Sequence, residues 1–115
     1  MDIKRTYKTI EMKNGRKLLT VEFDDPRYAI LSTFLFADYK AFSDWFDQKI
    51  QEVLDHEKES NNVSGNVCEL MITEKTTKVY DTLADDGMGA WCEIETEDLL
   101  SLIHEWKEKS KELSE

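Results

Sequence analysis

The sequence predicts a single α+β domain over residues 1–115, with an antiparallel sheet of five to six strands and two amphipathic helices on one face. Three features predict it. Apolar and polar residues alternate in several short segments, two longer segments carry apolar residues at helical spacing, and the connections between strand candidates are short. Short connections require antiparallel neighbours. A chain of 115 residues has room for one core. The expected order is β-β-(β)-α-β-β-β-α.

A β-hairpin is expected at the start of the chain. Asn14-Gly15 is typical of a two-residue type I′ turn. After this turn every second residue from Leu19 to Phe23 is apolar, so one face of the second strand can be buried. Residues 1–17 hold six cations and two carboxylates, a net charge of +4, whereas the remaining residues carry −14.

The segment after this hairpin has two interpretations. Tyr28–Phe36 is short and rich in aromatic and β-branched residues, which favours a third strand buried on both faces. Asp25 followed by Pro26 instead favours a helix, with Asp25 as its N-cap and proline at its first position. We prefer the strand, and the helix remains the alternative because short apolar runs discriminate poorly.

Two amphipathic helices are expected further along. The first has Asp38 as its N-cap, ends by residues 57–60, and is followed by a loop over Asn61–Asn66. The second has Thr96 as its cap, with acidic residues in its first turn. The apolar stripe of the first helix is Phe42, Trp45, Phe46, Ile50, Val53 and Leu54; that of the second is Leu99, Leu102, Ile103, Trp106 and Leu113.

Three strand candidates lie between the helices, over Val67–Thr73, Lys78–Leu83 and Trp91–Glu95. Cys68 and Cys92 fall in the first and the last of them. In a chain with a core of useful size, two such cysteines are expected to be buried reduced thiols. Whether they are cross-strand neighbours is open at this point.

The charge balance excludes some classes of function. Lys and Arg number 15 against 25 Asp and Glu, so the net charge is −10, which repels phosphate and argues against direct nucleic-acid binding. Tyr28–Ala37, the longest apolar stretch, has ten residues, whereas a membrane-spanning helix needs about 20. The N-terminus lacks the apolar segment of a secretory signal. We therefore expect a cytoplasmic protein with no membrane partner.

Catalytic and metal-binding signatures are not found in the sequence. Asp85-Asp86-Gly87 suggests a calcium loop, but with Gly87 at the sixth position of an EF-hand, positions one and three lack the required oxygens. His56 and His104 have no partners at zinc-ligand spacing, and Cys92 has no catalytic Cys-His signature around it. We expect no catalytic residue, no metal and no cofactor.

The acidic surplus has two interpretations. It either keeps a small protein soluble or forms a surface that docks on a basic protein partner. In the second case Trp91 is the candidate anchor, because tryptophan is enriched at binding hot spots. The candidate acidic residues around it are Asp85, Asp86, Glu93, Asp24 and Asp25.

Two segments, Phe34–Phe46 and Cys92–Trp106, carry a resemblance to a known class of proteins. The second segment is a strand that runs into an acidic-capped helix ending in Trp106. Both resemble the small acidic immunity proteins of bacterial polymorphic-toxin and contact-dependent inhibition systems. The resemblance implies non-catalytic, stoichiometric neutralisation of a cognate basic toxin domain, often a nuclease. The alternatives are a small cytosolic scaffold domain whose acidity serves only solubility and, more remotely, a hydrolase with a carboxylate cleft.

Overall fold

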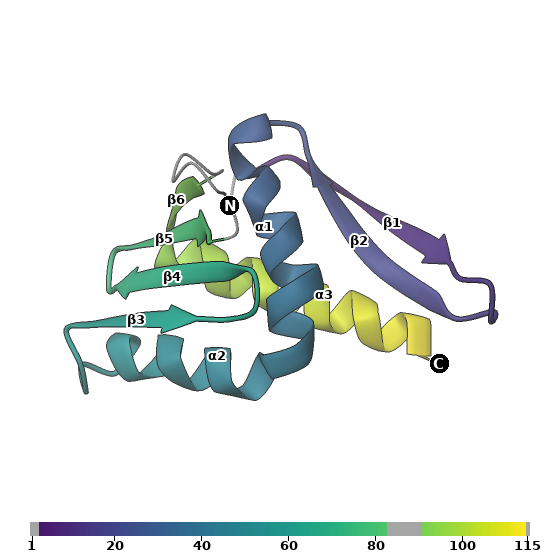
Figure 1. Ribbon diagram of the computed structural model, residues 1–115. Coiled ribbons are helices and arrows are strands. Elements are labelled where there is room, and N and C mark those ends of the chain that lie inside the picture. The colour runs from purple at the N-terminus through teal and green to yellow at the C-terminus, as the bar shows by residue number, and fades with distance from the viewer. Residues whose placement is uncertain (1–2, 83–90, 115) are drawn as a thin grey trace.

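A computed structural model describes residues 3–82 and 91–114 and confirms the α+β class (Figure 1). A helical segment of several parts follows an N-terminal hairpin, and a four-stranded sheet and a long C-terminal helix complete the chain. The elements are β1 (Arg5–Glu11), β2 (Lys17–Phe23), the 3₁₀ turn η1 (Pro26–Tyr28), α1 (Ala29–Thr33), the π-helical segment η2 (Phe34–Tyr39), α2 (Lys40–Leu54), β3 (Ser60–Ser64), β4 (Cys68–Thr73), β5 (Thr76–Asp81), β6 (Trp91–Glu95) and α3 (Thr96–Ser114).

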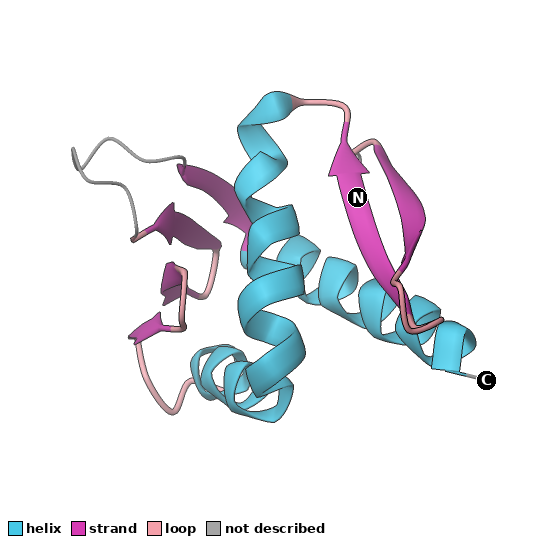
Figure 2. Cartoon of the chain, turned by 45° about the vertical axis from the view of Figure 1, so that its right-hand side comes forward, coloured by secondary structure: helices cyan, strands magenta, loops and turns pink. Residues whose placement is uncertain are grey.

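The strands form two sheets, so the expectation of a single sheet is wrong. β1 pairs with β2, and β3, β4, β5 and β6 form a separate antiparallel sheet in that order. The helices lie between the two (Figure 2), so they cover one face of the four-stranded sheet as expected. β2 turns its buried residues Leu19 and Val21 toward these helices, against α1 and α3, instead of extending the other sheet.

The strand expected over residues 28–36 is wrong, and the alternative helix is confirmed. The Asp25 carboxylate accepts from the backbone N–H of Arg27 at 2.9 Å, and Pro26 occupies the first position of η1. The segment looks strand-like because it is apolar on several sides at once, being packed between the sheet and the hairpin. Its buried residues are Ile30, Leu31, Phe34 and Leu35.

Asp38 does not cap a helix, contrary to expectation. It lies inside η2, is fully buried, and its carboxylate accepts from the backbone N–H groups of Asn66 at 2.9 Å, Val67 at 3.0 Å and Cys68 at 2.7 Å. A Cβ atom on Gly65 would lie 2.5 Å from the Asp38 Oδ2 atom, so a glycine is needed here. Asp38 thus fastens the β3–β4 turn to the helices.

Only part of the apolar stripe predicted for α2 is buried. Phe46, Ile50 and Val53 are in the core, but the side chains of Phe42 and Trp45 are 43% and 39% exposed. The backbone of Phe42 is non-helical, with φ −131° and ψ 38°. This break and the preceding π-helical turns change which residues face the core. A regular period of 3.6 residues therefore predicts the wrong face at the start of α2.

The loop predicted over Asn61–Asn66 is also wrong for its first four residues, because Ser60–Ser64 forms β3. Asn61 points inward and its side-chain amide donates to the carbonyl of Lys49 at 2.8 Å, near the end of α2. Val63 is buried on the same side of the strand. A polar residue can occupy this buried position because the Lys49 carbonyl and the Glu52 carboxylate both accept from its amide.

The hairpin turn differs from the predicted two-residue type. Met12 donates to the Arg16 carbonyl at 2.7 Å and Gly15 donates to the Met12 carbonyl at 2.9 Å, leaving a three-residue loop. Gly15 has φ +82°, whereas Asn14 does not have a positive φ. This is a type I turn followed by a left-handed glycine, the geometry common for three-residue hairpin loops.

The buried face predicted for α3 is confirmed, since Leu99, Leu102, Ile103 and Trp106 are in the core and Leu113 packs against it. Thr96 is the first residue of α3, and its hydroxyl donates to the carbonyl of Thr73 at 2.6 Å, which ties the helix start to the β4–β5 turn. Arg5 forms two hydrogen bonds to Glu105, at 2.7 and 2.6 Å, and so joins β1 to α3. No helix in the described part of the chain is long and apolar enough to cross a membrane.

Candidate partner-binding groove

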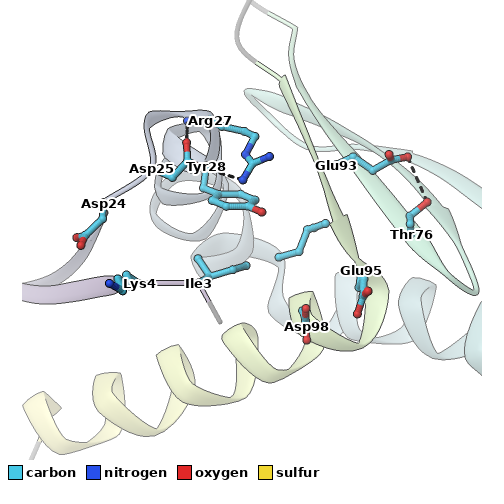
Figure 3. A pocket seen from close by; sticks show the side chains of 11 residues that line it. Ile3, Lys4, Asp24, Asp25, Arg27, Tyr28, Thr76, Glu93, Glu95 and Asp98 are labelled. Carbon is cyan, nitrogen blue, oxygen red and sulfur yellow. Dashed lines mark hydrogen bonds and ion pairs between the residues drawn. The ribbon is translucent and has the colours of Figure 1, made fainter. Parts of the chain in front are cut away.

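A groove of about 780 Å³ lies between β6, η1 and the beginning of α3 (Figure 3). The N-terminal segment before β1 closes one of its sides. Its apolar lining comes from Ile3, Tyr28 and Ile94. Its polar lining residues are Lys4, Asp24, Asp25, Arg27, Thr76, Glu93, Glu95 and Asp98.

The groove is acidic. Five of its lining residues are carboxylates and two are cations, an excess of three negative charges. One cation is already paired, because Arg27 Nη2 lies 2.8 Å from Asp25 Oδ2 and its guanidinium sits 4.9 Å from the centre of the Tyr28 ring. The field inside a concave site with one dominant sign attracts ligands of the opposite sign. The groove therefore suits positively charged side chains.

Three of the predicted binding residues meet in this groove. Asp24 and Asp25 come from the turn between β2 and η1, and Glu93 comes from β6, far away in the sequence. Asp25 also caps η1, while Glu93 accepts from the Thr76 hydroxyl at 3.3 Å. The sequence-based prediction thus selected residues that the fold places around one hollow.

Trp91 lies next to the groove rather than in its lining. It shares the outward face of β6 with Glu93 and Glu95, because side chains alternate along a strand. Its ring is stacked on Tyr80 of β5, with centroids 6.0 Å apart and an interplanar angle of 21°. Its side chain nevertheless remains 55% exposed, so most of a large apolar surface is available for contact. Asp85 and Asp86, also predicted, lie outside the described residues.

The sequence analysis missed other members of the groove. Glu95 follows Glu93 at a spacing of two, so strand alternation alone could have placed it on the same face. Asp98 lies in the first turn of α3, one helix turn beyond the strand end. Lys4 and Tyr28 had no comparable signal, because their position depends on how the hairpin and η1 pack against β6.

The other chemical groups singled out in the sequence are placed as follows. Cys68 and Cys92 are buried free thiols on β4 and β6, with β5 between them. Burial raises the pKa of Cys68 to about 12 and that of Cys92 to about 11, so both are poor nucleophiles at neutral pH. His56 and His104 are exposed. Among residues 3–82 and 91–114, no three His, Cys, Asp or Glu side chains are grouped to hold a metal ion.

Fold and groove define a small α+β protein with an open, acidic hollow beside an exposed tryptophan. Over 110 residues the chain is 38% identical to an immunity protein of Bacillus cereus, and the match covers 96% of this chain and 92% of that one. The chain belongs to the family of that immunity protein, which confirms the resemblance seen in the sequence. No protein-family model matches the chain, and no solved structure matches it either.

Proposed function

We propose that this protein is a non-catalytic immunity protein that binds a cognate, basic toxin domain in the cytoplasm of the producing cell and neutralises it. The observation that carries the proposal is the acidic groove, which gathers five carboxylates against two cations in a chain whose net charge is −10. A toxin that acts on nucleic acid carries a positively charged substrate surface. Such a surface is complementary to this groove, so a nuclease is the toxin class we favour.

Charge and apolar surface have separate roles in the proposed complex. The rim carboxylates Asp24, Asp25 and Glu93 steer the toxin into register and speed association. Trp91 supplies an apolar anchor beside them, because a large exposed ring buried on binding contributes more than a solvated rim charge. Asp85 and Asp86 would extend the acidic surround. Inhibition then follows from covering the toxin surface in a one-to-one complex.

A contact role fits the groove better than a catalytic role. Asp24, Glu93 and Glu95 are all exposed on its walls. Catalysis at carboxylates benefits from a site that closes and expels water around the reacting bond. Exposed carboxylates on an open hollow are instead accessible to the side chains of a large partner.

The test requires a toxin-like open reading frame adjacent to the gene for this protein and uses the domain that it encodes. Co-expression of the two in a bacterial host should restore growth, and the purified pair should form a one-to-one complex by calorimetry. Replacing Asp24→Asn, Glu93→Gln and Glu95→Gln together should weaken binding about 10- to 150-fold, because each rim charge contributes roughly 0.5 to 1 kcal/mol at low salt.

The matched control removes three carboxylates that do not line the groove, with Asp44→Asn, Glu57→Gln and Glu112→Gln. All three are exposed, so the net charge changes equally without touching the groove. Binding should then fall by no more than about threefold, through the weaker long-range field alone. Absence of protection and of a complex with the unaltered protein would contradict the proposal, as would equal losses in the two triple variants.

A further inference from the structure

β6 is an edge strand. Among the described strands its neighbour in the sheet is β5 alone. Thr96 donates its N–H to the carbonyl of Lys75 at 3.0 Å, which fixes the phase of the β5–β6 ladder. In an antiparallel pair the residues that exchange hydrogen bonds alternate with residues that do not. The N–H and C=O groups of Ile94 therefore bond to β5. Those of Glu93 and Glu95 point away from β5, to the free edge.

The groove opens along this same edge. Glu93, Ile94 and Glu95 line it, and η1 forms its opposite wall (Figure 3). A further strand would lie about 4.8 Å from the Glu93–Glu95 part of β6, and its inward-facing side chains would meet Ile3 and Tyr28. Because η1 also contacts β6, the room for this strand is short and suits a segment of a few residues. The volume of about 780 Å³ is within the range of ligand-binding pockets.

The charges on this edge select its occupant. A second copy of β6 would bring Glu93 and Glu95 opposite the same glutamates, and like charges directly opposite one another destabilise a strand pair. Natural edges are protected from self-association in this way. In a paired strand that carries lysine or arginine, each cation would instead lie opposite a carboxylate, and opposite charges stabilise a strand pair. The edge thus disfavours a second copy and favours a basic strand.

We infer that the free edge of β6 takes up an extended, basic segment of the toxin as an additional strand of the sheet. The inference rests on the function proposed above and specifies how the partner is held. The pairing predicts a pattern in the bound segment: lysine or arginine at the positions beside Glu93 and Glu95, alternating with apolar residues that enter the groove against Ile3 and Tyr28. Main-chain hydrogen bonds provide affinity, and the alternating side chains provide specificity.

Amide hydrogen exchange gives the direct test on the unaltered protein, alone and in complex with the adjacently encoded toxin domain. In the free protein the Glu93 and Glu95 amides should exchange much faster than that of Ile94, which is bonded to β5. In the complex both should slow by at least about 100-fold, as expected for newly formed ladder hydrogen bonds. Unchanged exchange at both amides in a formed complex would overturn the inference.

Substitutions separate main-chain pairing from charge. Glu93→Gln removes the charge and keeps the N–H, whereas Glu93→Pro also removes the outward N–H without taking a hydrogen bond from β5. The proline variant should bind at least about tenfold more weakly than the glutamine variant. Equal affinity of the two would overturn the inference.

The control is Asn62→Pro on β3, at the other edge of the sheet. Gly65 donates to the Cys68 carbonyl at 2.8 Å, so by the same alternation the Asn62 N–H points away from β4. This variant should match the unaltered protein in affinity within about twofold. Circular dichroism compares the folding of Glu93→Pro with that of Asn62→Pro. If Glu93→Pro does not fold, the hydrogen-exchange measurement on the unaltered protein tests the inference alone.

Failure of the inference and failure of the proposed function give different results. If the function is wrong, the unaltered protein neither protects cells nor forms a complex. If only the docking mode is wrong, protection and complex formation persist while the Glu93 and Glu95 amides exchange as in the free protein. A symmetric dimer of this chain with protected Glu93 and Glu95 amides would assign the edge to a second copy and would also overturn the inference.

Discussion

Replacing Asp38 with alanine is predicted to be among the most destabilising single substitutions in this protein. The Asp38 carboxylate is fully buried and accepts hydrogen bonds from three consecutive backbone N–H groups. Alanine leaves all three without an acceptor. The Cys68 N–H is buried, so its loss costs about 2 kcal/mol, and water can reach the N–H groups of Asn66 and Val67, so these cost roughly 0.5 to 1 kcal/mol each. The expected total is about 3 to 4 kcal/mol.

A double-mutant cycle with Gly65 isolates the cause. A Cβ atom at this position would lie 2.5 Å from Asp38 Oδ2, so Gly65→Ala alone should cost about 1 to 3 kcal/mol through overpacking. In the Asp38→Ala background the opposing carboxylate is gone, and the same substitution should cost much less. The coupling between the two positions should therefore be at least about 1 kcal/mol.

The assay is chemical unfolding followed by circular dichroism, with the free energy of unfolding extrapolated to water. The midpoint should fall while the denaturant slope stays constant, because the fold itself is retained. Asp44→Ala, at an exposed position on α2, is the control and should change stability by less than about 0.5 kcal/mol. An Asp38→Ala protein within about 1 kcal/mol of the unaltered protein, or an additive cycle, would refute the reasoning.

Three further predictions concern other parts of the molecule. Cys68 and Cys92 should react with a thiol reagent at pH 8 only when the protein unfolds, because burial raises the pKa of both thiols; rapid labelling of the native protein would contradict this. The hydrogen-bonded Arg5 guanidinium lowers the pKa of Glu105, so the stability from this pair, about 1 kcal/mol, is present above the unfolded-state pKa near 4.3 and is lost as the pH falls through the lower folded value. The melting temperatures of the unaltered and Glu105→Gln proteins should therefore differ at pH 7 and converge near pH 3, and a constant difference would be the contrary result. Trp91→Ala should change the free energy of unfolding by less than about 1 kcal/mol, since the ring is 55% exposed, and a larger loss in urea titration would assign Trp91 to the core instead of to binding.

The sequence predicted the class of fold and much of its detail where local signals were sufficient. The alternation after the turn placed the buried side of β2, and the spacing of Leu99, Leu102, Ile103 and Trp106 placed the buried face of α3. In each case the buried residues lie on one face of the element, so a single period describes them. The family resemblance was also carried by a local pattern, the strand that runs into α3.

Local signals failed where one segment contacts two layers. Ile30, Leu31, Phe34 and Leu35 repeat at intervals of one, three and one, which is a helical spacing, but neighbouring aromatic and β-branched residues concealed it. The helical spacing is explained by the structure, in which this segment packs against the hairpin on one side and the four-stranded sheet on the other. The Asp25-Pro26 signal at the start of this segment was the better guide, because capping depends on adjacent residues alone.

The remaining misses have a common physical origin in long-range hydrogen bonds. Asn61 is buried in a strand because the carbonyl of Lys49 accepts from its side chain. Asp38 is buried because the backbone N–H groups of a turn 28 to 30 residues away surround it. Sequence spacing does not reveal such partners. The groove belongs to the same category, since Asp24 and Glu93 become neighbours only through the packing of η1 beside β6.

The association rate constant, measured by stopped flow against ionic strength, tests most directly whether the acidic groove recognises a basic toxin. The adjacently encoded toxin domain is mixed with the unaltered protein and with the variant that carries Asp24→Asn, Glu93→Gln and Glu95→Gln. Screening shortens the reach of charges from about 30 Å at 0.01 M salt to about 8 Å at 0.15 M. The rate constant of the unaltered protein should fall steeply over this range, by at least about tenfold, and that of the variant much less. A rate constant that does not depend on salt, or the same dependence for both proteins, would contradict the account.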